Sequence, residues 1–224
     1  YNNYSISEIS EKLKKKKISS KALVQISKKS FQKNEKKIFA WNEISFSPKK
    51  IKNENKGILE NIPFGAKDIF NTINFKTEKG SIHWKNYKAG NNARVIDNLI
   101  NEGAILIGKT ITAEFAVHHL NKTRNPYDLS KTPGTSSSGS AASVAVGTVP
   151  FALASQTAGS ISRPSSFCGV WGMKPSFGLL PRTGVLKTSD TLDTLGFITS
   201  RVDNLKDILD VMRVKGPNYP FVYN

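Results

Sequence analysis

The stretch that decides the fold runs from Pro133 to Pro175 and reads PGTSSSGSAASVAVGTVPFALASQTAGSISRPSSFCGVWGMKP. Its serine- and glycine-rich segments enclose an apolar run, in which the small residues 141–146 predict a helix and residues 149–153 predict a buried strand. A flexible Gly/Ser linker lacks apolar residues to bury, whereas this stretch contains them throughout. The stretch therefore predicts two serine loops that flank one helix and one strand of a folded core.

Outside this stretch the chain alternates helical patterns with short apolar strands. Apolar spacing and breaker residues predict helices at about 5–13, 21–33, 93–102 and 202–212, and strands at 38–46, 58–66, 104–107 and within 176–199. Lys67 directly follows the second of these strands. A Lys/Asn-rich loop precedes that strand, residues 70–92 predict an irregular loop, and residues 111–132 predict helix and loop. This alternation is typical of an α/β layered fold.

The composition is basic, with a formal net charge of +16 in 224 residues. A basic surface attracts phosphates, but Arg, the better phosphate-recognition residue, is scarce and Lys dominates. We therefore favour a solvated lysine-rich face over a nucleic-acid-binding patch. The single cysteine excludes an internal disulfide, and no apolar run reaches the about 18 residues of a membrane span. We expect a cytoplasmic protein without a membrane segment.

Several short motifs suggest other chemistries but lack the required context. Residues 103–110 fit the P-loop expression Gly-x4-Gly-Lys-Thr, yet their middle positions are apolar and predict a strand instead of a phosphate-binding loop. His83, His118 and His119 could supply a base, but the sequence has no Gly-x-Ser-x-Gly nucleophile elbow. Cys168 lies among apolar residues, which predicts a packed thiol.

Blocks spread over the chain together resemble the amidase signature family. The family's Gly-Gly-Ser-Ser-Gly-Gly-Ser segment corresponds to residues 134–140, its Asp-x-Gly-Gly-Ser-Ile-Arg-x-Pro segment to residues 156–164, and its Phe-Cys-Gly to residues 167–169. The match extends upstream through residues 63–68, 108–110, 114–115 and 123–129. Blocks in matched order and spacing are a strong signal. The resemblance covers the family's N-terminal half, so it implies a mixed central sheet flanked by helices in a truncated domain.

The resemblance also implies a Ser-cisSer-Lys group that cleaves an amide bond. At the matching positions Ser160 is the nucleophile, Ser136 is the bridging serine of a cis peptide, and Lys67 is the base. An amide carbonyl is a poor electrophile, so the site also needs donors for the oxyanion. The expected donors are the backbone N–H groups of Thr157, Ala158, Gly159 and Ser160. Supporting side chains are expected at Ser137, Gln156 and Arg163.

Lys67 must be neutral to accept a proton in such a mechanism. An unperturbed lysine has a pKa of about 10.4, so its pKa must fall by roughly three units, or about 4 kcal/mol, to work near neutral pH. Burial beside two hydroxyls acts in that direction. An acyl-enzyme would then form, ammonia or an amine would leave, and water would complete the hydrolysis. The resemblance implies no cofactor and no metal.

The signature blocks depart from the family pattern. Thr135, Ser138 and Ala158 replace glycines, Gln156 replaces an aspartate, and the usual Arg is displaced by one position to Arg163. The Gln-Thr-Ala-Gly-Ser-x-x-Arg-Pro form is similar to a subset of general amidases. These departures affect the hydrogen bonding around the expected site and leave its three catalytic candidates in place.

Three functions remain open at this point. The first is a serine hydrolase that converts a small carboxamide to an acid plus ammonia or an amine, alone or as a homodimer. The second is the A subunit of a glutamyl-tRNA(Gln) or aspartyl-tRNA(Asn) amidotransferase, a glutaminase that works with partner subunits and tRNA. The third is an inactive truncated copy with a structural or interaction role. We expect one partial domain over residues 1–224, helical at 1–36, with a catalytic core at about 58–200.

Overall fold

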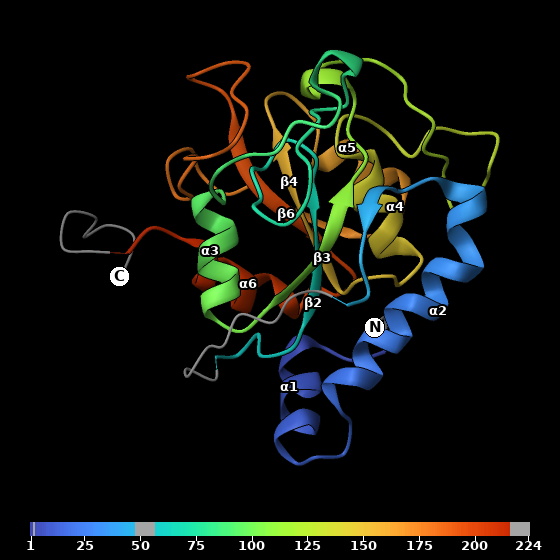
Figure 1. Cartoon of the computed structure of the whole chain (residues 1–224), viewed down its shortest axis with the longest axis vertical. Coiled ribbons are helices and arrows are strands. Elements are labelled where there is room, and N and C mark those ends of the chain that lie inside the picture. Colours follow the sequence, from blue (N-terminus) through green and yellow to red (C-terminus); the bar gives the residue numbers. More distant parts are fainter. Residues whose placement is uncertain (2, 48–56, 216–224) are drawn as a thin grey trace.

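The computed structural model describes residue 1, residues 3–47 and residues 57–215. The helices are α1 (Ile6–Lys14), α2 (Ser20–Ile38), α3 (Arg94–Asn101), α4 (Ser138–Ala145), α5 (Ser162–Phe167) and α6 (Asn204–Met212). The strands are β1 (Trp41–Ile44), β2 (Pro63–Lys67), β3 (Ile105–Thr110), β4 (Phe151–Gln156), β5 (Trp171–Met173) and β6 (Thr194–Thr199). Figure 1 shows the strands gathered in the middle of the molecule, with helices on both sides.

The strands of the described residues form one mixed sheet in the order β1-β3-β2-β4-β6-β5. Strand β2 pairs in parallel with β3 and β4, whereas the β1–β3, β4–β6 and β5–β6 pairs are antiparallel. Parallel strands end at the same edge, so the carboxyl ends of β2, β3 and β4 meet the amino-terminal end of β6. Every position of β2, β4 and β6 is buried, as expected for strands covered on both faces.

Two apolar layers cover the sheet. Successive side chains of β4 point to opposite faces, so Phe151 and Leu153 pack with α1, α3 and α6, while Ala152 and Ala154 pack with α4. The small residues on the second face allow α4 to approach the sheet closely. The predicted α/β fold, with a mixed sheet flanked by helices, is thus confirmed.

Local signals set the N-terminal boundaries. Ser5 and Glu8 form the predicted capping box of α1. Helix α2 is capped by Phe39, whose φ is 50°, and the Glu35 carboxylate accepts hydrogen bonds from the backbone N–H groups of Ala40 (3.1 Å) and Trp41 (2.9 Å). Because residues 39 and 40 form the turn after α2, β1 begins at Trp41, later than the predicted start at residue 38.

Some sequence predictions of local structure are wrong. The helix predicted within residues 111–132 is replaced by a 3-10 turn at Glu114–Ala116, because Phe115 there has a left-handed φ of 48°. The strand predicted over residues 58–66 begins only at Pro63, since turns precede it. The Lys/Asn-rich loop before it lies largely outside the described residues. Helix α5 and strand β5 were not predicted, because serines, a proline and a glycine obscure their patterns.

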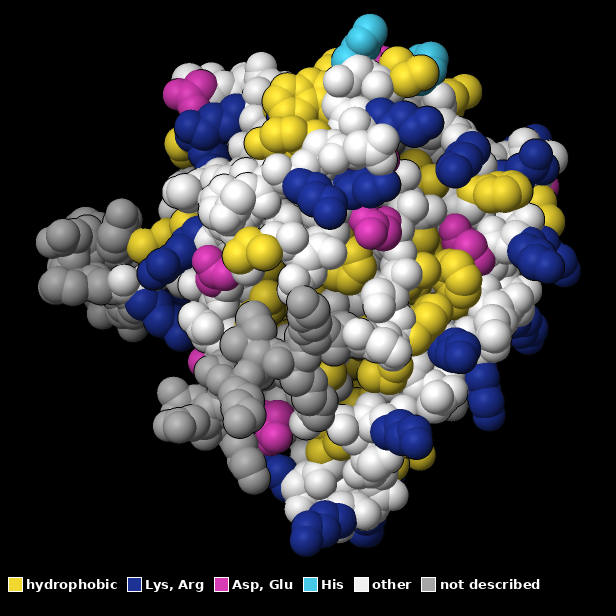
Figure 2. Space-filling model, in the orientation of Figure 1, with side chains coloured by type: hydrophobic (Ala, Val, Ile, Leu, Met, Phe, Trp, Pro, Cys, Tyr) yellow, Lys and Arg dark blue, Asp and Glu magenta, His cyan; other side chains and the backbone are white. Residues whose placement is uncertain are grey.

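The surface carries the basic charge of the chain in a dispersed form. On the face shown in Figure 2, lysine and arginine side chains stand singly or in small groups between apolar and uncharged atoms. That face therefore lacks one continuous basic patch. Within the described ranges, no helix combines the length and hydrophobicity of a bilayer span.

Candidate active site

Lys67 lies at the carboxyl end of β2 with a fully buried side chain. Its Nζ donates hydrogen bonds to Ser136 Oγ (2.7 Å) and Ser155 Oγ (2.9 Å). Burial lowers the pKa of Lys67 to about 7, against the opposing effect of the negative charge on Asp193. The charged amine loses its hydration when buried, so its neutral form becomes available near neutral pH. The side chain thus meets the requirement for a proton acceptor.

Ser136 lies in the loop that leads into α4. The Thr135–Ser136 peptide bond is cis, as the family resemblance implied. The Ser136 carbonyl accepts a hydrogen bond from Ala113 N (3.1 Å), which fixes the loop against the segment after β3. Next to it, Ser137 N donates to the carbonyl of Ser160 (3.3 Å). These bonds hold Ser136, the hydrogen-bond partner of Lys67, beside the loop after β4.

Ser160 is 6 % exposed and follows β4 by four residues. Its backbone is joined to the Ser136 loop through Ser137, whose Oγ also donates to the carbonyl of Ser155 (3.3 Å). Among the described residues, no hydrogen bond links Ser160 Oγ to Ser136 Oγ. The structure therefore places Lys67 and Ser136 in direct contact and brings Ser160 beside them through its backbone.

The loop of residues 157–160, expected to supply the oxyanion donors, is closed by the side chain of Gln156. Its Oε1 accepts hydrogen bonds from the backbone N–H groups of Ile161 (2.8 Å) and Ser162 (2.9 Å) at the start of α5. One side chain thus joins the end of β4 to the first turn of α5, which fixes both ends of the loop. Glutamine thus supplies an acceptor oxygen at the position where the family pattern has aspartate.

Arg163 covers the outside of the same loop. A Cβ added at Gly159 would lie 3.2 Å from Arg163 Nη2, and Nη1 lies 3.5 Å from the carbonyl oxygen of Thr135. The guanidinium therefore contacts both the loop after β4 and the residue before Ser136. His118 Nδ1 lies 3.4 Å from Nη1, on the exposed side.

Two side chains at this edge of the sheet were not predicted. Ser155 precedes the last residue of β4, whose parallel pairing with β2 aligns Ala66 with Leu153 and so brings Ser155 near Lys67. Asp193 precedes β6, whose first residue aligns with Gln156. A polar residue at the end of an apolar strand was the available signal for Ser155. No comparable signal marks Asp193 in the sequence.

The other motifs have structural roles. Lys109, the lysine of the P-loop-like segment, is fully buried in β3 and forms an ion pair with Asp68 (3.1 Å). Cys168 is buried, and burial raises the pKa of its thiol to about 12, which fits the predicted packed group. The described part of the chain contains no cluster of three or more His, Cys, Asp or Glu that could hold a metal ion.

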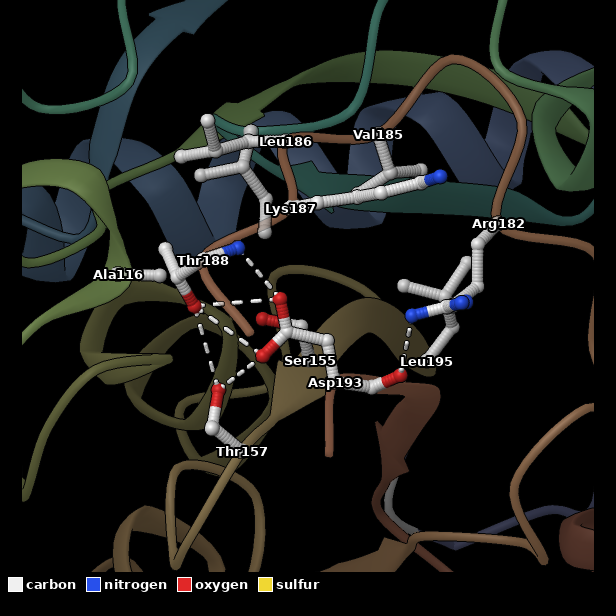
Figure 3. Close-up of a pocket in the computed structure, with 11 residues that line it drawn as sticks. Ala116, Ser155, Thr157, Arg182, Val185, Leu186, Lys187, Thr188, Asp193 and Leu195 are labelled. Carbon is white, nitrogen blue, oxygen red and sulfur yellow. Dashed lines mark hydrogen bonds between the residues drawn. The ribbon is translucent and has the colours of Figure 1, made fainter. Parts of the chain in front are cut away.

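A small pocket opens beside Ser155, between β4 and the loop that precedes β6. Figure 3 shows the Asp193 carboxylate in its middle, with Thr157 on one side and Thr188 on the other. Arg182 approaches the backbone of Asp193 instead of its carboxylate. Lys187 and several apolar side chains complete the lining, namely Ile69, Ala116, Val185, Leu186 and Leu195.

Comparisons with known proteins find a matching family and related chains. The family model described as Amidase matches residues 26–219. The A subunit of glutamyl-tRNA(Gln) amidotransferase from Lactobacillus gasseri is 36% identical over 226 residues, a match that covers 97% of this chain and 47% of that protein. The chain spans about half the length of such curated relatives.

Solved structures show the same relationship. The structure of the glutamyl-tRNA(Gln) amidotransferase A subunit from Thermotoga maritima matches with a TM-score of 0.85 and 31% identity, over 97% of this chain and 48% of that one. A peptide amidase from Stenotrophomonas maltophilia matches with a TM-score of 0.85 and 25% identity, over 97% of this chain and 49% of that one.

Proposed function

Because the chain belongs to the amidase family, we propose that it releases ammonia from glutamine as the A subunit of a tRNA-dependent amidotransferase. The curated relatives and the Thermotoga structure carry this name, which favours glutaminase activity over a free-standing amidase. The observation that carries the amide-cleaving chemistry of the proposal is the fully buried Lys67, whose Nζ contacts Ser136 Oγ at 2.7 Å. A buried amine with a lowered pKa between two hydroxyls is suited to proton transfer.

In the proposed acylation step, Ser160 Oγ attacks the carboxamide carbon of the substrate. Its proton passes to Ser136 Oγ while the Ser136 proton passes to the neutral Nζ of Lys67. The carbonyl oxygen becomes an oxyanion, which accepts hydrogen bonds from backbone N–H groups of residues 157–160. Donors of this kind, held in place before the reaction, are worth about 3 kcal/mol each.

Collapse of the tetrahedral intermediate breaks the carbon–nitrogen bond. The proton held by Lys67 returns through Ser136 to the leaving nitrogen, so ammonia departs and an ester remains on Ser160. Water then attacks this ester and gives its proton to the same Ser136–Lys67 pair. The bond to Ser160 Oγ breaks as that proton returns to it through Ser136, and glutamate leaves. In the amidotransferase assembly the ammonia would pass to a partner subunit that holds the aminoacylated tRNA.

A stand-alone amidase is the second candidate. Gln156 occupies the position of the family's aspartate, in a form similar to general amidases, and the matching peptide amidase has the same fold. Such an enzyme would use the same three side chains on a different carboxamide. The chemistry at Lys67 therefore does not separate the two candidates, but their substrates and partners do.

The test uses the protein as its gene encodes it, purified with whatever subunits accompany it. Ammonia release is measured from glutamine and from a panel of simple amides, beside a Ser160→Ala control. We expect release from glutamine, lost in the control, and stoichiometric copurification of a second subunit. Release from other amides by the chain alone would replace the proposal with the stand-alone amidase. No release from any amide, and no labelling of Ser160 by a fluorophosphonate, would favour the inactive copy.

A further inference from the structure

The Asp193 carboxylate joins two loops that approach Lys67 from different directions. On one side it accepts a hydrogen bond from Thr157 Oγ1 (2.5 Å), the first residue after β4. On the other side it accepts hydrogen bonds from Thr188 N (2.5 Å), Thr188 Oγ1 (3.1 Å) and Ser189 N (2.9 Å). Figure 3 shows both threonine hydroxyls directed at the carboxylate. Asp193 therefore fastens the loop of residues 187–189 to the start of the expected oxyanion loop.

Strand register explains why these groups meet. Gln156 aligns with Thr194 in the antiparallel β4–β6 pair, so Thr157 and Asp193 are the next residues on each strand. The neighbouring segment is fixed as well, because Phe70 forms a β-bridge with Val185 just after β2. The carboxylate thus lies at the edge of the sheet where β4 and β2 end, the strands that carry Ser155 and Lys67.

The hydrogen bonds of this pocket argue against a substrate-recognition role. Both Asp193 oxygens already accept several donors of the chain itself. The Arg182 guanidinium is likewise engaged, with Asp190 through its carbonyl (2.6 Å) and carboxylate (3.2 Å). A ligand would have to displace these internal bonds. Asp193, Thr157, Thr188 and Ser189 together form a structural clasp beside the site.

We propose that Asp193 is a positioning residue. It holds Thr157, and with it the backbone of residues 158–160, in place, and it puts one negative charge near Lys67. The inference rests on the proposed function, since it assigns the loop of residues 157–160 to oxyanion binding. Asp193 acts through its hydrogen bond to Thr157 and through the electrostatic effect of its charge on Lys67, without contacting the substrate. The negative charge favours the protonated form of Lys67 and so opposes the effect of burial.

Other charged groups surround this cluster and must be held constant in a test. On the β2–β3 side lies the Asp68–Lys109 ion pair, and on the loop before β6 lie Arg182 and Lys187. Asp190, on the same loop, forms exposed ion pairs with Arg182 (3.2 Å) and Lys187 (3.6 Å), and its side chain is 77 % exposed. Asp190→Asn is therefore the matched control, because it removes the same charge from the same loop outside the clasp.

The experiment compares Asp193→Asn, Thr188→Val and Asp190→Asn with the unchanged protein. Each variant is the whole protein that the gene encodes, apart from its one substitution. The rate of Ser160 labelling by a fluorophosphonate is measured against pH. Asp193→Asn should move the midpoint of the rising limb to lower pH by roughly half a unit to one unit, because a nearby opposite charge is lost. Its plateau rate should fall about tenfold or more, because the oxyanion donors are displaced. Thr188→Val keeps the charge, so it should lower the plateau without moving the midpoint.

A second measurement separates this inference from the proposed function. Hydrogen–deuterium exchange of the amides at residues 157–160 and 187–189 should rise in Asp193→Asn and stay unchanged in Asp190→Asn, with α1 as an internal reference. This readout does not require activity. Unchanged exchange in Asp193→Asn, or a midpoint that moves equally in Asp190→Asn, would overturn the clasp. Absence of labelling in the unchanged protein, with the exchange effect present, would instead reject only the proposed function.

Discussion

Lys67 Nζ lies 2.7 Å from Ser136 Oγ although 69 residues separate them in the chain. The contact forms because β2 ends at the edge of the sheet where the loop before α4 begins, and because every position of β2 is buried. A lysine amine held there cannot reach water, so its pKa falls instead. The position of one strand end thus lowers the pKa of a residue type that is usually exposed and charged, as the proposed role of base requires.

The rate at which a fluorophosphonate labels Ser160, measured against pH, tests the proposed role of Lys67 as the base. The pKa of Lys67 is lowered to about 7, and the neutral amine is the reactive form, so the rate of Ser160 labelling should rise with pH and level off above pH 7 to 8. Lys67→Ala should lower the plateau about a hundred- to ten-thousand-fold, the usual contribution of acid–base catalysis. Lys206→Ala, which removes an exposed lysine of α6, is the control. A pH-independent rate would contradict the assignment.

Ser155 should be needed for the rate as well. Lys67 Nζ donates to Ser155 Oγ at 2.9 Å, which orients the amine toward Ser136. Ser155→Ala should slow labelling of Ser160 about two- to tenfold, since a hydrogen bond between neutral groups is worth about 0.5–1.5 kcal/mol. Ser155→Thr keeps the hydroxyl and should recover most of the rate. Equal rates for Ser155→Ala and the unchanged protein would show that Ser136 alone orients the amine.

The fold class and the contact between Lys67 and Ser136 could be predicted from the sequence, because both depend on strong local patterns and matched blocks. Strand β5 could not, because it has only three residues, with Gly172 between Trp171 and Met173. That strand forms because Gly172 packs on α5, where an added Cβ would lie 2.2 Å from Ser165 Oγ. Tertiary contact decided the outcome, and no periodicity of the sequence predicts such a contact.

The same explanation applies to Asp193, which the sequence did not predict as part of the candidate site. Asp193 meets Thr157 only because Gln156 aligns with Thr194 across the β4–β6 pair. A shift of one residue in that register would send the carboxylate to the other face. The sequence alone does not specify the register of strands separated by a long loop. Site residues fixed by matched motifs could therefore be predicted, whereas those fixed by register could not.

Lys109 should matter for stability. It is buried in an ion pair with Asp68 and also donates hydrogen bonds to Thr77 Oγ1 (2.9 Å) and the Phe70 carbonyl (2.7 Å). Lys109→Met leaves the Asp68 carboxylate without its cation, so the free energy of unfolding should fall by about 3–5 kcal/mol. Urea unfolding of Lys109→Met and of the Asp68→Asn/Lys109→Met pair measures this loss. The double variant should recover part of it, and a double variant as unstable as the single one would contradict the account.

The same pair predicts a pH dependence of stability. Burial raises the pKa of Asp68 to about 6 even beside Lys109, above its ordinary value of 3.8. A raised carboxyl pKa means that the folded state binds more protons, so this group's contribution to stability falls as pH rises from 3.8 toward about 6. Without Lys109 the pKa rises further and the window extends to higher pH. Urea unfolding should therefore show a smaller deficit for Lys109→Met at pH 5 than at pH 8.

Gly139 offers a prediction opposite to helix propensity. Within a helix, Gly→Ala ordinarily stabilises by about 1 kcal/mol. At Gly139 in α4, however, the new Cβ would lie 2.2 Å from the Ala40 carbonyl oxygen and 2.4 Å from Ile111 N. Those two atoms are hydrogen-bonded to each other (2.9 Å), and Gly139 N donates to the Ile111 carbonyl (3.0 Å), so neither backbone can move alone.

Gly139→Ala should therefore lower the free energy of unfolding by about 2 kcal/mol or more, as overpacking of a close contact does. Gly90→Ala is the control, because nothing lies within 4 Å of its added Cβ and it should leave stability nearly unchanged. Because α4 follows Ser136 directly, displacing this helix should also pull Ser136 away from Lys67 and slow labelling of Ser160. A Gly139→Ala variant that unfolds at the same or a higher urea concentration would show that α4 does not need this close approach.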